Sequence, residues 1–248
     1  MVFCCLLISG FGCLTVHLRA GDQTDRRVIL EAVGYLVPVR QVTISPKVSG
    51  IVIEVMIDEG RVVQAGEVIA RLDPAFYEAA RDLAQAKLHR AQLLVKKAEA
   101  GANKEDVALA EADVSIAKAE LRIAQTRLDG TIVRAPITGT VLTKKVEVGS
   151  MVNPTAASIC EMADLRQLEV DVWVQEQDFA KVSIGQKCLI QVEASPKTQY
   201  QGRVARILPL VDRSKGAVGV RVRLDASKTM DTLRPEMRAR VEFVQETK

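Results

Sequence analysis

Two long alanine-rich segments with helical periodicity occupy the middle of the sequence, from about Ala75 to Asp129. In the second segment, apolar residues recur at steps of three and four, which is the spacing of a coiled-coil seam. These residues are Val107, Ala110, Val114, Ala117, Leu121, Ala124 and Leu128. The first segment repeats the spacing if one stutter is allowed between Ala80 and Leu88. We therefore predict an antiparallel helical hairpin over residues 74–130.

Local sequence signals mark the ends of both helices. Asp73 before Pro74 is a favoured N-cap followed by a proline at the first helical position. Gly101 can end the first helix in the left-handed conformation, and Asn103 can cap the second helix. Each arm would be roughly 40 Å long. Alanine at many seam positions buries little area, so we expect the hairpin to be rooted in a globular base and packed beside copies of itself.

One short β-motif occurs twice, once on each side of the hairpin. Gly50 and Gly60 recur as Gly139 and Gly149 at one constant offset, and the apolar positions between them also match. Alternation of apolar and polar residues over 51–58 is typical of a half-buried strand. Two such halves can bury a core that neither could bury alone. We predict that residues 46–73 and 131–163 form one β domain interrupted by the hairpin.

The repeated segments also carry a family resemblance. The stretches that carry it are Val48-Ser-Gly-Ile-Val52, Gly66-Glu-Val-Ile-Ala-Arg-Leu-Asp73 and Arg134-Ala-Pro-Ile-Thr-Gly-Thr-Val141. They resemble the two half-motifs of a biotinyl/lipoyl domain. A lipoyl-like domain split by a helical hairpin is similar to the HlyD-like membrane fusion proteins, the periplasmic adaptor subunits of tripartite efflux and secretion systems. The tip, Ala98 to Val107, resembles that of DevB-like adaptors paired with ABC exporters.

The remainder of the chain contains short alternating strands separated by turns, which favours a small β-barrel or sandwich over residues 164–248. The resemblance implies the barrel domain of the family, to which residues 28–45 would add strands. The family usually has glycine where this chain has Glu236. The predicted fold class is mainly β, with an inserted α-helical coiled-coil hairpin, a split lipoyl-like domain, a small β-barrel domain and an N-terminal membrane anchor.

The N-terminal segment from Val2 to Leu18 is almost entirely apolar. As a helix it would be slightly shorter than a bilayer core. We predict a transmembrane anchor or an uncleaved signal over residues 1–20, with a cleaved signal peptide as the alternative. Arginines follow this segment and none precedes it, which is the reverse of the usual arrangement for export of the following chain.

Composition and motifs argue against several classes of function. A net charge of +3 and an aromatic content of 4% do not indicate a nucleic-acid partner. The five cysteines have neither zinc-site nor disulfide-framework spacing. No nucleophile elbow, phosphate loop or catalytic carboxylate pair is evident in the sequence. We therefore expect no catalytic residues, no cofactor, no metal site and no enzymatic activity.

The resemblance implies a docking site at the hairpin tip. Family adaptors bind a TolC-like outer-membrane channel through an arginine, a leucine and a serine at fixed spacing. Arg90 and Leu94 match the first two, whereas Gly101 stands where the serine is expected. The predicted site comprises Arg90, Leu94, Gly101, Ala102, Asn103, Lys104, Glu105 and Asp106. A solvated coiled-coil end without a partner is the alternative.

The resemblance implies an adaptor anchored in the inner membrane and extending into the periplasm. It would form a homo-oligomer, a hexamer by analogy, between an inner-membrane transporter and a TolC-like channel. An ABC exporter is favoured over a resistance-nodulation-division (RND) pump by the tip sequence alone. Two alternatives remain, which are a lipoyl or biotinyl carrier module of a multi-subunit enzyme and a membrane-tethered coiled-coil scaffold.

Overall fold

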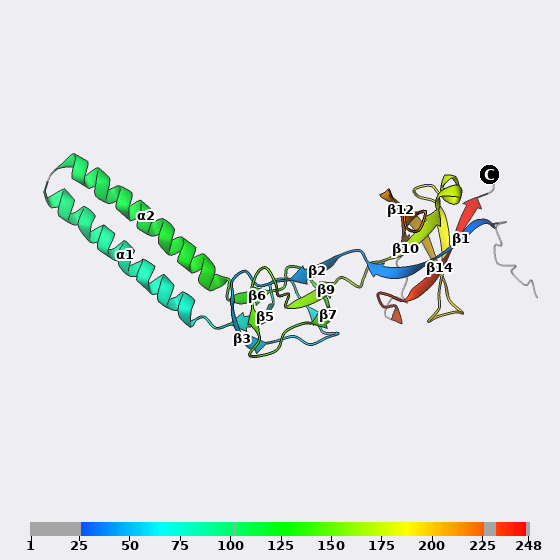
Figure 1. Ribbon diagram of the computed structural model, residues 1–248, viewed down its shortest axis with the longest axis horizontal. Coiled ribbons are helices and arrows are strands. Elements are labelled where there is room, and N and C mark those ends of the chain that lie inside the picture. The colour runs from blue at the N-terminus through cyan, green and yellow to red at the C-terminus, as the bar shows by residue number, and fades with distance from the viewer. Residues whose placement is uncertain (1–25, 102, 226–231, 247–248) are drawn as a thin grey trace, which may run out of the picture.

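The computed structural model describes residues 26–101, 103–225 and 232–246 of the 248-residue chain. Its parts lie in a row, with the helical hairpin at one end, a β-sandwich in the middle and a β-barrel at the other end (Figure 1). The predicted anchor over residues 1–20 lies outside the described residues. Within the described ranges, no helix combines the length and hydrophobicity needed to cross a membrane.

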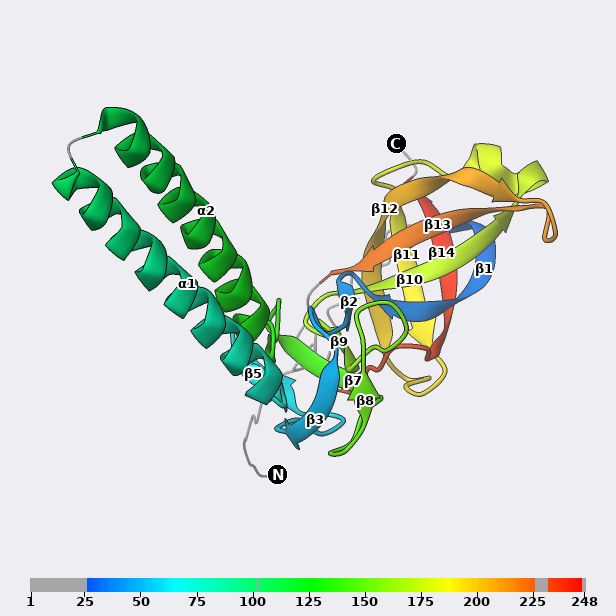
Figure 2. The same cartoon turned by 60° about the vertical axis from the view of Figure 1, so that its left-hand side comes forward.

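The hairpin consists of α1 (Ala75–Ala100) and α2 (Lys104–Asp129), which run side by side over their whole length (Figures 1 and 2). Pro74 occupies the N-cap position of α1, one residue later than predicted, and the Asp73 carboxylate before it accepts a hydrogen bond from the Ala75 amide at 3.0 Å. The helices bury five alanines and one leucine of the seam against each other, namely Ala84, Leu88 and Ala91 of α1 and Ala110, Ala117 and Ala124 of α2. An ion pair of 2.9 Å between Lys87 and Glu120 joins the helices outside the seam.

The middle body is a sandwich of two four-stranded sheets. One sheet has the strand order β2-β9-β7-β4 and the other β6-β5-β3-β8. The strands before the hairpin are β2 (Gln41–Ile44), β3 (Gly50–Val55), β4 (Val62–Val63) and β5 (Val68–Leu72). Those after it are β6 (Ile132–Arg134), β7 (Gly139–Lys144), β8 (Met151–Val152) and β9 (Cys160–Ala163). Each sheet thus draws two strands from either side of the hairpin.

The two sheets are related by the internal repeat. The glycine repeat relates β3 to β7 and β4 to β8. When β2 is likewise exchanged with β6, and β5 with β9, the strand order of one sheet becomes the strand order of the other. The core contains residues from both halves, including Val52 and Ile69 from the first and Val141 and Ile159 from the second, all with at most 1% of their surface exposed. The prediction of one β domain interrupted by the hairpin is therefore correct.

The far body is a closed barrel with the strand order β1-β10-β13-β12-β11-β14. Its strands are β1 (Arg26–Pro38), β10 (Leu168–Gln175), β11 (Lys187–Val192), β12 (Gln199–Asp212), β13 (Ala217–Leu224) and β14 (Arg238–Glu246), with the short 3₁₀ helix η1 (Glu176–Lys181) after β10. Inward-facing residues on alternate strand positions, such as Val170, Val172, Val220 and Val222, fill its interior.

One predicted boundary differs from the structure. Residues 28–45 were expected to join the barrel as a unit, but only β1 does so. The next strand, β2, pairs with β9 in register from Gln41 opposite Ala163 to Ile44 opposite Cys160, so it belongs to the sandwich. The short interval between β1 and β2, Val39 and Arg40, therefore carries the chain from one body to the other.

Glu236 occupies a backbone position that favours glycine. Its φ is 66°, and within the described ranges it is the one non-glycine residue with positive φ. The turn nevertheless closes on β1, because the Glu236 amide donates to the Leu36 carbonyl at 2.8 Å and the Leu36 amide donates to the Met237 carbonyl at 2.9 Å. This turn therefore forms without the glycine that the family usually has there.

Candidate interaction surfaces of the hairpin and barrel

The hairpin tip is a short polar connection with its own hydrogen bonds. The Asn103 side chain accepts from the Glu105 amide at 3.2 Å and donates to the Asp106 carboxylate at 2.8 Å, so it caps α2 as predicted. Lys104, Glu105 and Asp106 are exposed. The two acidic residues stand in the first turn of α2, where they interact favourably with the helix dipole. Ala102 lies outside the described residues.

Gly101 does not adopt the left-handed conformation that the sequence suggested. Its φ and ψ are −82° and −8°, within the right-handed helical region. Its amide donates a shared hydrogen bond to the carbonyl of Ala98 at 3.0 Å and to that of Lys97 at 3.3 Å. The last turn of α1 therefore narrows toward 3₁₀ geometry, and the backbone does not enter the left-handed region. The expected cap was wrong because tightening the helix already satisfies this amide without positive φ.

Arg90 and Leu94 lie on α1, below the tip, and both are exposed; Leu94 exposes 42% of its surface. Leu94 lies nearly two turns of α1 before Gly101, and Arg90 lies about three turns before it. The structure therefore places the predicted docking residues on an extended strip, with the arginine and leucine on the helix and the remainder at its end.

The predicted seam of α2 faces α1. Ala110, Ala117 and Ala124 are buried, and Val107, Val114, Leu121 and Leu128 are partly buried. Leu88, Ala91 and Ala117 form one buried cluster, with Val114 and Leu121 packed against it. Most seam contacts therefore involve alanine, which allows the two helices to approach closely but gives each turn little buried area.

A second apolar row on α2 was missed by the sequence analysis. Leu109, Ile116 and Ile123 of α2 expose 67%, 60% and 53% of their surface, and lie seven residues apart. The signal was present in the sequence as a second heptad pattern, two residues later than the seam.

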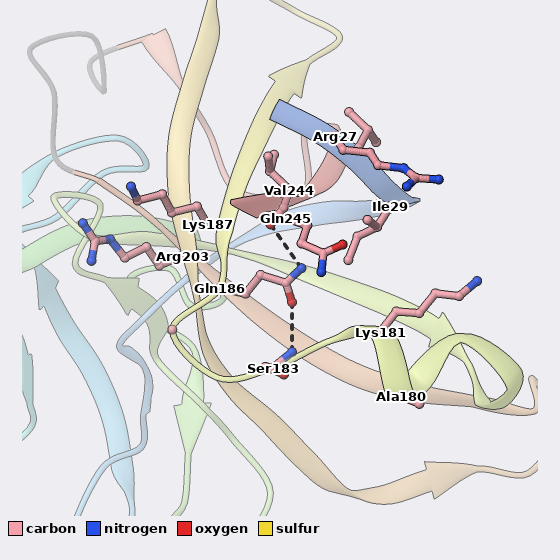
Figure 3. A pocket seen from close by; sticks show the side chains of 12 residues that line it. Arg27, Ile29, Ala180, Lys181, Ser183, Gln186, Lys187, Arg203, Val244 and Gln245 are labelled. Carbon is pink, nitrogen blue, oxygen red and sulfur yellow. Dashed lines mark hydrogen bonds between the residues drawn. The ribbon is translucent and has the colours of Figure 1, made fainter. Parts of the chain in front are cut away.

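The outer end of the barrel has an open cleft of about 910 Å³ (Figure 3). Four basic residues, Arg27, Lys181, Lys187 and Arg203, are among those lining it. Gln186 crosses its floor, accepting from the Ser183 amide at 2.9 Å and donating to the Val244 carbonyl at 3.4 Å. Figure 3 shows Lys187 and Arg203 on one side and Arg27 and Lys181 on the other, so the basic groups do not converge on one point.

The junction between barrel and sandwich contains a charged pair. The Asp164 amide donates to the Arg40 carbonyl at 3.0 Å, and its carboxylate accepts hydrogen bonds from the Arg166 guanidinium at 2.7 and 2.8 Å. The bonds from Arg166 hold the pKa of the Asp164 carboxyl below its usual value. In the part of the chain that is described, no group of three or more His, Cys, Asp or Glu residues could hold a metal ion.

Two family models together match most of the chain. The model described as "RND MFP, barrel-sandwich hybrid domain" matches residues 40–160, and the model described as "CusB-like, beta-barrel domain" matches residues 168–247. The chain belongs to the membrane fusion protein family. The two matches correspond to the sandwich with its hairpin and to the barrel.

Curated relatives of this membrane fusion protein include nodulation protein NolF of Rhizobium meliloti strain 1021, which is 30% identical over 212 residues and 78% of this chain. Multidrug resistance protein MdtA of Klebsiella pneumoniae is 25% identical over 241 residues and 86% of this chain. In both cases the match covers 58% of the relative, so the chain spans a little over half of the length of these relatives.

A solved chimera of MacA and MexA, which contains the Pseudomonas aeruginosa MexA α-hairpin domain, superposes on this membrane fusion protein with a TM-score of 0.79. The two are 25% identical, and the match covers 89% of this chain and 84% of the chimera. The Spr0693 membrane fusion protein of Streptococcus pneumoniae R6 has the same fold, with a TM-score of 0.74 at 19% identity, over 88% of this chain and 100% of Spr0693.

Proposed function

We propose that this membrane fusion protein is a periplasmic adaptor that links an inner-membrane transporter to a TolC-like outer-membrane channel. The observation that carries the proposal is the placement of the hairpin and the barrel at opposite ends of the sandwich (Figure 1). A protein of this shape offers one surface to each of two partners that lie in different membranes. The hairpin tip would meet the channel and the barrel would meet the transporter.

The proposed transporter is an ABC exporter rather than an RND pump. The support is the tip sequence, Ala98 to Val107, with its resemblance to DevB-like adaptors. The description of the first family model contains the word RND, so an RND partner is the second candidate. The similarity to a protein named for multidrug resistance supports export as the class of process.

The adaptor would act without chemistry of its own. It would be a homo-oligomer, a hexamer by family analogy, held at the inner membrane by the predicted segment over residues 1–20. It would bind no cofactor and no nucleic acid, and its role would be to complete a sealed conduit and to transmit the state of the transporter.

Site-specific photo-crosslinking in cells that carry the native partners tests the proposal. A crosslinking residue in place of Lys104 at the tip should capture an outer-membrane channel. One in place of Leu210, which is 80% exposed at the end of the barrel, should capture a transporter subunit. A probe in place of Arg71, exposed on the sandwich, is the matched control. Capture of neither class by the first two probes would refute the adaptor role.

The carrier and scaffold alternatives have distinct outcomes. A lipoyl or biotinyl carrier would show an adduct on a lysine in the intact mass of the purified protein. In lipoyl domains that lysine lies on a tight turn, whereas here the two halves are joined by the whole hairpin. A coiled-coil scaffold would yield crosslinks from Lys104 to a soluble helical protein and none from Leu210 to a transporter.

A further inference from the structure

The cleft at the outer end of the barrel presents positive charge. Of the described residues that line it, four are basic and none is acidic. Lys181 pairs with Asp178 at 2.7 Å, so its charge is partly compensated. Arg27 and Arg203 are exposed and form no ion pair with any other described residue. These two arginines therefore give the cleft an uncompensated positive charge.

The basic groups are spread across the cleft. Lys187 and Arg203 lie opposite each other on the neighbouring strands β11 and β12. Arg27, on β1, and Lys181, in η1, lie on the other side of the cleft (Figure 3). A pocket for one small anion brings several donors within hydrogen-bond distance of that anion. An open cleft of about 910 Å³ with cations on both sides suits instead a surface that presents many anionic groups.

Two exposed apolar side chains accompany the basic groups. Ile184 lies in a tight turn, which is closed by a hydrogen bond of 3.2 Å from the Gln186 amide to the Ser183 carbonyl. Ile184 exposes 70% of its surface, and Val28, which lines the cleft on β1, exposes 47%. Surfaces that combine basic and exposed apolar residues bind membrane interfaces, because the apolar side chains enter the interface while the cations attract anionic lipids.

The sequence places this end of the barrel close to the predicted membrane segment. The first residues of β1 line the cleft, and β1 begins at the end of the barrel remote from the sandwich (Figure 1). Five residues, 21–25, separate β1 from the segment predicted over residues 1–20. The chain from residue 20 to residue 26 spans at most about 20 Å when fully extended. The cleft therefore lies near the surface of any bilayer that holds this segment.

We propose that the cleft end of the barrel docks on a bilayer surface that contains anionic phospholipids. The lipid phosphates pair with Arg27 and Arg203, and Val28 and Ile184 enter the interface. The inference goes beyond the adaptor role and rests on one part of it, the attachment of the chain to the membrane through residues 1–20. Because the hairpin lies at the opposite end of the row of bodies, docking at this end directs the hairpin tip away from the bilayer (Figure 1).

The proposed transporter contact at Leu210 uses a different part of the barrel. Leu210 is flanked by Pro209 and Val211, which line a separate hollow of about 490 Å³ together with Phe179 of η1. None of the residues that line this hollow also lines the cleft. The barrel can therefore contact lipid at the cleft and a transporter at Leu210 at the same time.

A fluorescent label in the full chain, reconstituted into vesicles, tests the inference. Cys4, Cys5 and Cys13 are changed to Ser, and Ile184→Cys is labelled with the polarity-sensitive dye NBD, while the buried Cys160 and Cys188 stay unlabelled. In vesicles of equal parts phosphatidylglycerol and phosphatidylcholine, the emission should shift to shorter wavelength and be quenched by spin-labelled lipid headgroups. In vesicles of phosphatidylcholine alone, both effects should be lost.

The matched control is a label at the other end of the barrel. Lys197 is exposed in the turn between β11 and β12, remote from the cleft. NBD on Lys197→Cys should report water in both kinds of vesicle. A label at Ile184→Cys that also stays in water in the anionic vesicles would overturn the proposal, as would equal quenching at both positions.

Charge variants test the role of the two arginines. Arg27→Gln with Arg203→Gln should shift the equilibrium away from the docked state by about fivefold for each charge removed. Salt at about 1 M, where the Debye length is about 3 Å, should also release the label into water. Lys47→Gln with Lys197→Gln removes the same charge from exposed positions away from the cleft and should leave the signal unchanged. Equal effects of the two double variants, or none from either, would overturn the proposal.

Failure of this inference can be told from failure of the adaptor role. The vesicle experiment contains only this chain and lipid, and requires neither transporter nor channel. If the label at Ile184→Cys stays in water and a photo-crosslinker in place of Ile184 captures a transporter subunit in cells, the cleft binds protein and the lipid contact is rejected. Capture of partners at Lys104 and Leu210 would then still support the adaptor role. Docking in vesicles without partner capture would do the reverse.

Discussion

The amide of Gly60 donates a hydrogen bond to the carbonyl of Val141 at 2.9 Å. The repeat-related bond runs in the other direction across the sandwich, from the Gly149 amide to the Val52 carbonyl at 2.8 Å. Each glycine has positive φ, 83° and 91° respectively. The turn of one half therefore closes on a strand of the other half, so neither half is complete without its counterpart.

Replacing these glycines with alanine should destabilise the sandwich by about 1 kcal/mol each, because a Cβ is strained at positive φ. Steric clash does not contribute, since nothing lies within 4 Å of a Cβ at either position. Gly60→Ala and Gly149→Ala should each lower the melting temperature of the sandwich in scanning calorimetry. Gly50→Ala, where the nearest atom would be 3.4 Å away, is the control. No change in either variant would contradict the strain argument.

The opposite substitution should stabilise the barrel. Glu236→Gly relieves the left-handed conformation of a residue with a Cβ, which is worth about 1 kcal/mol. The increase should appear as a higher denaturant midpoint in Trp173 fluorescence, because the chain has one tryptophan and it lies on β10 of the barrel. Glu236→Ala keeps the Cβ and should give no comparable gain. A destabilising effect of Glu236→Gly would show that the side chain has a role that outweighs strain.

The hairpin and the repeat were predictable because each is specified by a pattern along the chain. The seam follows from spacing alone, and a stutter in α1 did not disturb it. The duplicated glycines and strands predicted a shared core because two half-domains have no other way to bury their apolar faces. The strands of the barrel were also visible as alternation between turns, as in Leu168–Gln175.

Other features depend on contacts that no local pattern records. Strand β2, Gln41-Val-Thr-Ile44, alternates polar and apolar residues but does not show which body it joins, and its membership of the sandwich is decided by pairing with β9. The conformation of Gly101 depends on which carbonyls are in reach at the end of α1. The second apolar row of α2, Leu109, Ile116 and Ile123, was overlooked because an apolar residue outside the first seam can be assigned only when the facing helix is known. The barrel cleft combines residues from distant strands, so sequence order gave no indication of it.

Shortening Leu88 should melt the hairpin selectively. Leu88 is 7% exposed at the centre of a seam that is otherwise mostly alanine. Leu88→Ala should therefore cost about 2–3 kcal/mol, and Leu121→Asp should cost more by placing a charge in the seam. The circular dichroism signal at 222 nm should fall, whereas Trp173 fluorescence should keep its native spectrum. His89→Ala, on the exposed side of α1, is the control. Equal loss of both signals would mean that the hairpin and barrel unfold together.

The junction between barrel and sandwich should weaken in acid. Arg166 lowers the pKa of Asp164 in the folded chain, so this contribution to stability is present above about pH 4 and is lost as the pH falls through the folded pKa. Asp164→Asn should therefore reduce stability slightly at pH 7, because an ion pair with so exposed an arginine contributes little, and the difference should shrink as the pH falls through the folded pKa of Asp164. In an Arg166→Gln background the effect of Asp164→Asn should shrink. If the stability difference between Asp164→Asn and the native chain persists in acid, it comes from packing and not from the charge of Asp164.

The two buried thiols give each β body its own probe. Burial raises the pKa of Cys160 in the sandwich to about 11 and that of Cys188 in the barrel to about 12. Thiol reagents attack the thiolate, so both should be inert at pH 8 in the native chain. In a variant with Cys4, Cys5 and Cys13 changed to Ser, two thiols should react only after unfolding.

An added Lys197→Cys, on an exposed loop, should react within minutes and serves as the positive control for the reagent. In increasing urea, peptide mapping of the labelled chain then shows which thiol opens first. If the barrel and sandwich are independent units, as their separate cores indicate, Cys160 and Cys188 should be labelled with different midpoints. A single shared midpoint would mean that the short junction couples the two bodies into one cooperative unit, and rapid labelling of either thiol in the native chain would contradict its burial.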